Sequence, residues 1–289
     1  MGSAPPLRIW PLVVSRFSLD GGAMFGVIPR PLWSKAHPPD DLGRISLVSR
    51  VLVIKNEKSG RIALVDTGMG SDWSTRDQGR YNLDTKATPT LDNALLAVGV
   101  QTKEVTDVFL SHLHFDHAGG TVCLTRNGDH SPLFPHARYH VQKTQWEWAC
   151  RPSARDSGSF VQRHLKTLDD HGVLEINNNG PLYTDFAIEM RVVGGHTPGL
   201  QIPIIRGEHH TVVFPSDLIP THAHGQLPWI MAYDLFPLET LRDKEQLLED
   251  AFHGKWILVL EHDPSIGAAQ AIQKSGKLIL EPCVCPDAI

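Results

Sequence analysis

The densest group of chemically active side chains lies in the segment HLHFDHAGG, residues 112–120. On an extended segment, side chains two positions apart point the same way, so His112 and His114 can reach one ion. A turn directly afterwards can aim Asp116 and His117 at a second ion, and the following glycines let the backbone bend tightly. Imidazole and carboxylate without thiolate suit zinc, or else manganese, iron or cobalt. We therefore predict a site for two divalent metal ions, with zinc as the first choice.

A site for two ions needs ligands from elsewhere in the chain, and three candidates follow the first motif. His196 lies in the turn GGHTPG, Asp217 lies in PSD after an apolar run, and His262 lies in EHDP after another. Taken singly, each has an alternative interpretation as a cap or a hydrogen-bonded residue at a strand end. Their order behind the first motif, at the ends of strands where open sheets usually bind ligands, makes them candidate ligands. A solvated histidine-rich loop is the alternative for the first motif, but three His and one Asp within six residues disfavour it.

The elements that must position these residues are short strands and helices. Apolar runs at 51–55 and 61–65 flank a polar turn and predict a β-hairpin. Residues 90–99 begin with a threonine N-cap, continue with helical apolar spacing and end at a glycine, which predicts a helix. Further patterns predict a strand at 105–110, helices around 143–149, 159–170 and 240–252, and a strand at 256–260. We therefore expect a mixed α/β fold in which helices cover sheets.

The order H-x-H-x-D-H, then His196, then Asp217, then His262 resembles the metallo-β-lactamase superfamily, and Asp66-Thr67-Gly68 is similar to the early D-T-G turn of that family. The resemblance covers roughly residues 50–265. It implies an α/β fold of the four-layer αβ/βα sandwich type, with the metals at one edge between the two sheets. We expect one such domain over residues 1–289, with its core at about 50–265 and extensions at both ends.

The resemblance also assigns roles to individual residues. It implies one metal held by His112, His114 and His196, a second held by Asp116, His117 and His262, and Asp217 as the bridge between them. Asp66 is expected to support the site from behind rather than to bind metal directly.

Two cations that share a water molecule lower its pKa, so a bridging hydroxide can form near neutral pH. We therefore predict a binuclear metal-dependent hydrolase that acts on a small ester, lactone or phosphoester. Asp116 is the candidate catalytic residue, because it can orient the water and then pass a proton to the leaving group. Two alternatives stay open: a nucleotide phosphodiesterase of the same superfamily, and a non-catalytic, metal-stabilised binding module.

Within the superfamily, the motifs are most similar to those of N-acyl-homoserine lactonases and of organophosphate or ester hydrolases. The lactonases carry a Tyr three residues after the bridging Asp, and this chain has Pro220 there. The candidate substrate contacts that could take its place or wall a pocket are Tyr233, His222, His224, Trp229 and Phe236. For each of them, packing in the core or a place on the surface is the competing interpretation.

Composition limits the partners. The net charge is −5, and no block of Lys and Arg appears, which argues against long nucleic acid and against a membrane surface. The start lacks the basic and apolar regions of a secretory signal, so we expect a cytoplasmic protein. The 4 Cys are expected to be reduced thiols that bind no metal. The expected partner is a small-molecule substrate, and a homodimer is left open.

Overall fold

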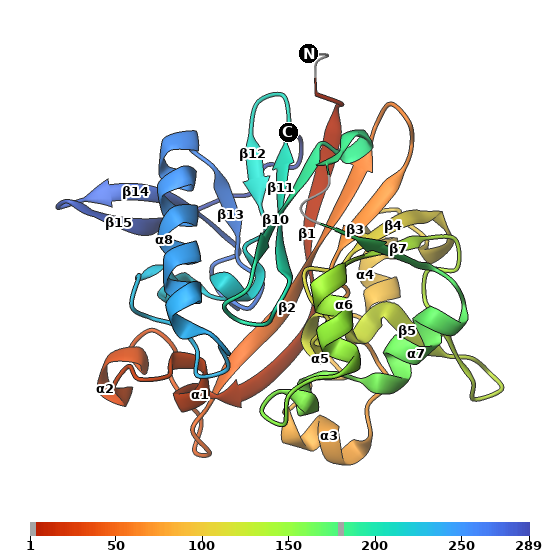
Figure 1. The fold of residues 1–289 in the computed structure, drawn as a ribbon, viewed down its shortest axis with the longest axis horizontal. Helices are drawn as coiled ribbons and strands as arrows, with labels where there is room; N and C mark the ends of the chain where they lie inside the picture. Colours follow the sequence, from red (N-terminus) through yellow and green to blue (C-terminus); the bar gives the residue numbers. More distant parts are fainter. Residues whose placement is uncertain (1–3, 179–181) are drawn as a thin grey trace.

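Two β-sheets face each other in the computed structural model, which describes residues 4–178 and 182–289 (Figure 1). The first sheet has the strand order β1 (Leu7–Asp20), β2 (Arg44–Asn56), β3 (Ile62–Val65), β4 (Val105–Phe109), β7 (Arg138–Gln142) and β8 (Leu174–Asn177). The second has the order β15 (Lys277–Cys283), β14 (Ala268–Lys274), β13 (Ile257–Val259), β12 (Thr211–Val213), β11 (Leu200–Arg206), β10 (Ile188–Val193) and β9 (Leu182–Tyr183). A small hairpin is formed by β5 (Val122–Leu124) and β6 (His130–Pro132).

Helices cover the outer faces of both sheets (Figure 1). The second sheet is covered by α8 (Pro237–Gly254), and the first by α4 (Leu91–Ala97), α6 (Lys143–Cys150) and α7 (Gln162–Asp170). The shorter helices are α1 (Gly21–Phe25), α2 (Arg30–Trp33), α3 (Thr75–Arg80) and α5 (Phe115–Ala118). The 3-10 turns are η1 (Thr102–Glu104), η2 (Gly119–Thr121), η3 (Ser157–Ser159), η4 (Thr184–Phe186), η5 (Ser216–Leu218) and η6 (His222–Gly225).

Three hydrophobic cores separate four layers, and strand β2 shows how the sequence builds them. Val51 and Val53 pack into the core under α4, α6 and α7, whereas Leu52 and Ile54 pack into the core between the two sheets. Successive side chains of a strand point to opposite faces, so a continuous apolar run is needed where both faces are covered. On the second sheet, Ile257 and Val259 of β13 pack into the core between the sheets, whereas Leu258 packs into the core under α8. The prediction of a four-layer αβ/βα sandwich is confirmed.

Most of the expected elements are present with shifted ends. The hairpin at 51–65 forms as the antiparallel pair β2–β3, and the helix expected at 90–99 forms as α4. The helix expected at 159–170 begins only at residue 162, because Phe160 forms an isolated β-bridge with His114. The segments expected as extensions supply β1 at one edge of the first sheet, and both β14 and β15 at one edge of the second.

Two parallel strand pairs define the end of the sandwich at which the predicted ligands lie. Strand β3 runs parallel to β4 in one sheet, and β12 runs parallel to β13 in the other. Parallel strands end at the same edge of their sheet, so the residues that follow them gather there. Asp66 and His112 follow the first pair, and Asp217 and His262 follow the second.

Candidate metal centre

The seven predicted metal ligands meet at one end of the sandwich, where the loops after β4, β12 and β13 converge. None of them is more than 7% exposed. They lie before and within α5 (His112, His114, Asp116 and His117), between β10 and β11 (His196), in η5 (Asp217) and after β13 (His262). The structure therefore brings together every residue that the sequence placed in the predicted metal site.

Helix α5, which carries Asp116 and His117, is held by the loop that follows β3. Thr67 donates its backbone N–H and its hydroxyl to the carbonyl of His117, at 2.7 and 2.8 Å. A Cβ on Gly119 would lie 2.2 Å from the carbonyl oxygen of Met69, so only glycine fits there without backbone movement. The glycine after the histidine motif thus lets this loop approach α5 closely and fix its position.

A first set of four ligand atoms belongs to His112, His114, His196 and Asp217, and these atoms lie within 4.8 Å of one another. His196 Nε2 lies 3.0 Å from Asp217 Oδ2 and 3.1 Å from His114 Nδ1. His112 Nε2 lies 3.7 Å from the same Asp217 oxygen. Three imidazole nitrogens and one carboxylate oxygen therefore surround one point.

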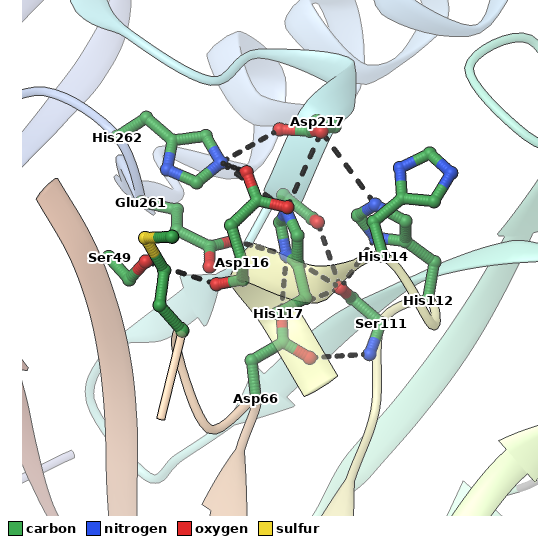
Figure 2. Close-up of polar contacts among 12 residues, drawn as sticks. Ser49, Asp66, Ser111, His112, His114, Asp116, His117, Asp217, Glu261 and His262 are labelled. Atoms are coloured by element: carbon green, nitrogen blue, oxygen red, sulfur yellow. Dashed lines mark hydrogen bonds and ion pairs between the residues drawn. The ribbon is translucent and has the colours of Figure 1, made fainter. Parts of the chain in front are cut away.

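A second set belongs to Asp116, His117 and His262 (Figure 2). His262 Nε2 lies 3.3 Å from His117 Nε2, and the two Asp116 oxygens lie 3.7 and 3.8 Å from these nitrogens. Asp217 also reaches this set, because its Oδ1 lies 3.1 Å from His262 Nε2 and its Oδ2 lies 3.5 Å from His117 Nε2. Asp217 is therefore the residue that both sets share.

The hydrogen bonds on the outer side of the histidines decide which nitrogen faces inward without a proton. His196 Nδ1 donates to Asp234 Oδ1 at 2.8 Å, and His262 Nδ1 donates to the Val48 carbonyl at 2.8 Å. Because these Nδ1 atoms carry hydrogen, a neutral ring presents a bare lone pair at Nε2. His196 Nε2 presents that lone pair to the first set, close to His114 Nδ1.

His117 lies against two acidic side chains rather than one. Its Nδ1 lies 2.9 Å from Asp66 Oδ2 and 3.0 Å from a Glu261 oxygen, and Asp66 also accepts from the hydroxyl of Ser111 at 2.6 Å. Burial raises the pKa of Glu261 to about 8. With Nδ1 committed to these groups, His117 Nε2 faces inward toward His262 Nε2. Burial lowers the pKa of His117, but neighbouring carboxylates outweigh burial and raise this pKa well above its ordinary range, so a cation between the two Nε2 atoms would take the place of protons there.

The electrostatics of the buried cluster favour positive charge at its centre. Burial lowers the pKa values of His196 and His262, but neighbouring carboxylates outweigh burial and raise them to about 10 and about 9. Burial and the neighbouring imidazoles hold the pKa values of His112 and His114 well below the ordinary range. His112 Nε2 is buried without a hydrogen-bond partner. Inward lone pairs, carboxylates and an unpartnered nitrogen together fit divalent cations.

The cysteines take no part in this centre. All four are free, and within the described ranges no cluster of candidate ligands contains one. Among the described residues, the side-chain atoms gathered at this centre are imidazole nitrogens and carboxylate oxygens.

A cavity of about 480 Å³ opens onto the two ligand sets. His114, Asp116, His196, Asp217 and His262 form its floor. Its walls are formed by Leu19, Met24, Arg80, Tyr81, Phe115, Arg155, Asp156, Gly158, Ser159, Met231, Ala232 and Tyr233. The cavity therefore has a polar floor and walls with a large apolar share.

The predicted substrate contacts are only partly brought to this cavity. Tyr233 lines it, and burial raises the pKa of its hydroxyl, which keeps it protonated at neutral pH. His224 is buried elsewhere, stacked on Phe25 and bonded to the Met24 carbonyl at 2.8 Å. His222 contacts the backbone of β15, with Nε2 3.0 Å from the Leu280 carbonyl oxygen, and does not line the cavity.

Trp229 and Phe236 also lie outside the cavity wall. Trp229 packs edge-on against Phe25, and Phe236 is 43% exposed just before α8. Like His222 and His224, these two residues pack against neighbouring side chains or lie at the surface, and none of the four lines the cavity. Pro220 contributes its carbonyl to the backbone N–H of His262 at 2.9 Å and does not line the cavity.

Sequence reasoning missed several residues that the structure places at the centre. Asp234 holds His196, and Glu261 contacts His117. A signal for Asp234 was present, because it is the one charged residue within the apolar stretch 228–236. Tyr81, which lines the cavity together with Tyr233, gave no such signal.

The sandwich and its paired His and Asp sets define a metal-binding α/β class of protein, and the chain belongs to the metallo-beta-lactamase superfamily. The model of that family matches residues 46–262.

Curated relatives carry the name N-acyl homoserine lactonase AttM. The protein from Rhizobium radiobacter is 25% identical over 179 residues, which is 60% of this chain and 63% of that protein. The protein from Rhizobium johnstonii is 24% identical over 181 residues, which is 58% of this chain and 62% of that protein. The chain therefore matches less than two thirds of the length of these relatives.

Solved structures match over almost the whole chain. A probable metal-dependent hydrolase from Staphylococcus aureus has a TM-score of 0.85 at 25% identity, covering 99% of this chain and 100% of that one. AidC, described as a dizinc quorum-quenching lactonase, has a TM-score of 0.77 at 20% identity, covering 99% of this chain and 97% of that one. At this identity, the likeness to AidC concerns the fold.

Within the part of the chain that the structure describes, no helix combines the length and the apolar character needed to cross a membrane.

Proposed function

We propose that the protein is a binuclear metal-dependent hydrolase of a small lactone or ester. The observation that carries the proposal is the position of Asp217. One of its oxygens lies 3.1 Å from His262 Nε2 and the other 3.0 Å from His196 Nε2, so a single carboxylate can serve both ligand sets.

In this proposal His112, His114 and His196 hold one divalent ion, Asp116, His117 and His262 hold the other, and Asp217 contacts both. Zinc is the proposed metal, with manganese, iron or cobalt as alternatives, because the donors are imidazole and carboxylate. Such a pair, when bound, supplies Lewis acidity and a hydroxide nucleophile near neutral pH.

Asp116 is the proposed proton carrier of the reaction. Its carboxylate lines the cavity, and its oxygens stay 3.7 and 3.8 Å from the neighbouring imidazoles. Its backbone carbonyl accepts from the hydroxyl of Ser49 at 3.0 Å, which anchors the residue through a group that does not line the cavity. The carboxylate can therefore orient water and move a proton to the leaving oxygen of the opened ester or lactone.

The cavity supports a lactone or ester with an apolar tail. Leu19, Met24, Phe115 and Met231 give its wall large apolar surface next to the polar floor. Tyr233 can donate its hydroxyl proton to a substrate carbonyl, which is the task of the family tyrosine that this chain lacks. The lactonase names of the AttM relatives support this substrate class.

A phosphoester is the second candidate, and one observation favours it. Arg80 and Arg155 both line the cavity, and a guanidinium is well suited to an anionic phosphate. Arg155 also donates to the Ala232 carbonyl, so one of the two is already engaged in holding the wall. The lactone or ester therefore stays the leading proposal.

The decisive experiment combines metal analysis with a substrate panel. Purified protein is reconstituted with zinc and assayed on N-acyl-homoserine lactones of several chain lengths, aryl esters, a phosphotriester and a cyclic nucleotide. We expect lactone or ester turnover that disappears on chelation and returns with zinc. Turnover that survives complete metal removal, or hydrolysis of the phosphoesters alone, would contradict the proposal.

A further inference from the structure

A second cluster of metal-binding side chains lies outside the cavity, where three distant segments meet. Asp72 follows the D-T-G loop, His130 is the first residue of β6, and His164 lies in the first turn of α7. Their ligand atoms lie within 4.8 Å of one another. The side chain of His164 is 5% exposed and that of Asp72 is 16% exposed, so the cluster is not a loose surface arrangement.

The spacing of this cluster matches that of the central ligands. His130 Nε2 and His164 Nε2 lie 2.8 and 3.2 Å from Asp72 Oδ2. Tetrahedral ligands at zinc bond lengths of about 2.1 Å stand about 3.4 Å apart. Both imidazoles thus point their Nε2 atoms at one carboxylate oxygen. The side chains would need to move only slightly for a single zinc ion to bind all three atoms.

Hydrogen bonds alone explain the arrangement poorly. Arg163 Nε donates to the same Asp72 Oδ2 at 2.7 Å, so three donors converge on one oxygen that has two lone pairs in its plane. His164 Nδ1 is buried without a hydrogen-bond partner. No group therefore donates to Nδ1, and nothing on that side of the ring requires the proton to be on Nε2. A cation at this point relieves the crowding, because both Nε2 atoms then present lone pairs instead of protons.

We propose that Asp72, His130 and His164 form a separate zinc site with two histidines, one aspartate and an open fourth position. Two imidazoles and one carboxylate are a known zinc ligand set. Arg163 is half exposed and also donates to the backbone carbonyl of Asp72 at 2.9 Å. Its bond to the carboxylate can therefore break while its bond to the backbone stays in place. The site is independent of the proposed function, since none of its residues lines the cavity.

An ion at this site ties together two walls of the cavity. Trp73, next to Asp72, packs edge-on against Tyr81 and Phe115, which both line the cavity. Helix α7 follows directly on the wall segment 155–159. The ion therefore joins the loop that carries Trp73 to the helix that follows the lining segment 155–159.

The test is a zinc titration of the full chain with the bound metal measured after gel filtration. We expect one more tightly bound zinc per chain in the wild type than in the double variant His130→Gln/His164→Gln. His171→Gln is the matched control, because His171 caps the same helix and its Nδ1 donates to the Thr167 carbonyl, at 2.8 Å. Equal zinc content in the wild type and the double variant would overturn the proposal.

A second variant separates a metal site from an ion-pair network. Arg163→Gln removes the competing cation, so it should tighten zinc binding at this site, measured as a lower dissociation constant for the ion that the double variant lacks. Unchanged or weaker zinc binding in Arg163→Gln would also overturn the proposal. Asp217→Asn disturbs only the central ligands, so retention of the additional ion in that variant distinguishes this site from a failure of the proposed binuclear centre.

Discussion

The hydrogen bond from His196 to Asp234 offers the sharpest test of the metal centre. Asp234 has a side chain that is 1% exposed, and its Oδ1 accepts from His196 Nδ1 at 2.8 Å. Asp234→Asn keeps the size of the side chain and leaves an oxygen that can still accept this bond, but it removes the charge that makes the imidazole a stronger ligand. Loss of such an outer partner typically weakens metal binding by about 10- to 100-fold.

The binding free energy of the ion in the first set should therefore become less favourable by about 1.4 to 2.8 kcal/mol. The assay is competition with a chelator of known affinity, which resolves the two central ions by their dissociation constants. We expect one dissociation constant to rise by about 10- to 100-fold. The other should change less, because His117 and His262 keep their own outer partners.

The chain supplies a matched control in a second buried pair of the same chemistry. Asp107 Oδ1 lies 2.9 Å from His140 Nε2, and Arg61 also pairs with this carboxylate. Asp107→Asn should lower the stability of the fold and leave zinc affinity unchanged. Equal loss of zinc affinity in both variants, or none in Asp234→Asn, would refute the reasoning that the outer hydrogen bond sets the strength of the ligand.

Three further predictions follow from the site and its surroundings. Asp116→Ala should lower kcat by at least about 100-fold through loss of proton transfer, and a variant with near-normal turnover and full metal content would contradict that role. Tyr233→Phe should lower kcat about 100-fold with unchanged metal content, whereas Tyr183→Phe, far from the cavity, should not, as steady-state kinetics on the best substrate of the panel can show. Burial lowers the pKa of His224 to about 3 in the folded protein. As pH falls below about 6.5, His224 therefore takes up a proton in the unfolded chain but stays neutral in the folded one, and the fold loses stability. The wild type should thus lose about 2 kcal/mol more stability than His224→Gln between pH 7 and pH 5 in denaturant titrations, and equal losses would place the pH dependence elsewhere.

The candidate metal ligands were predictable because the spacing of the first four is local and the order of the other three behind them resembles that of a known family. His112, His114, Asp116 and His117 fall within six residues, and the structure gathers them as the period of an extended segment and a following turn suggests. The four layers were predictable through the family resemblance. Apolar runs such as 51–55 support them, because such a run is needed where both faces of a strand are covered.

The supporting residues were harder to predict, because their roles depend on contacts between distant segments. Asp234 meets His196 across 38 positions of sequence. Tyr233 and His224 looked alike as candidates, but the turn at 222–225 directs His224 into the packing around Phe25 and leaves Tyr233 at the cavity. Periodicity carries no information about which way such a turn faces.

The candidate ligands come from both sheets, so metal binding would also affect the stability of the fold. His112, His114 and His117 follow a strand of the first sheet, whereas Asp217 and His262 follow strands of the second. Bound ions would act as a cross-link between the two halves of the sandwich, and their binding energy would add to the energy of folding. A free zinc concentration one hundred times a dissociation constant adds about 2.7 kcal/mol for that ion, so the melting temperature of this protein should track the metal content of its surroundings.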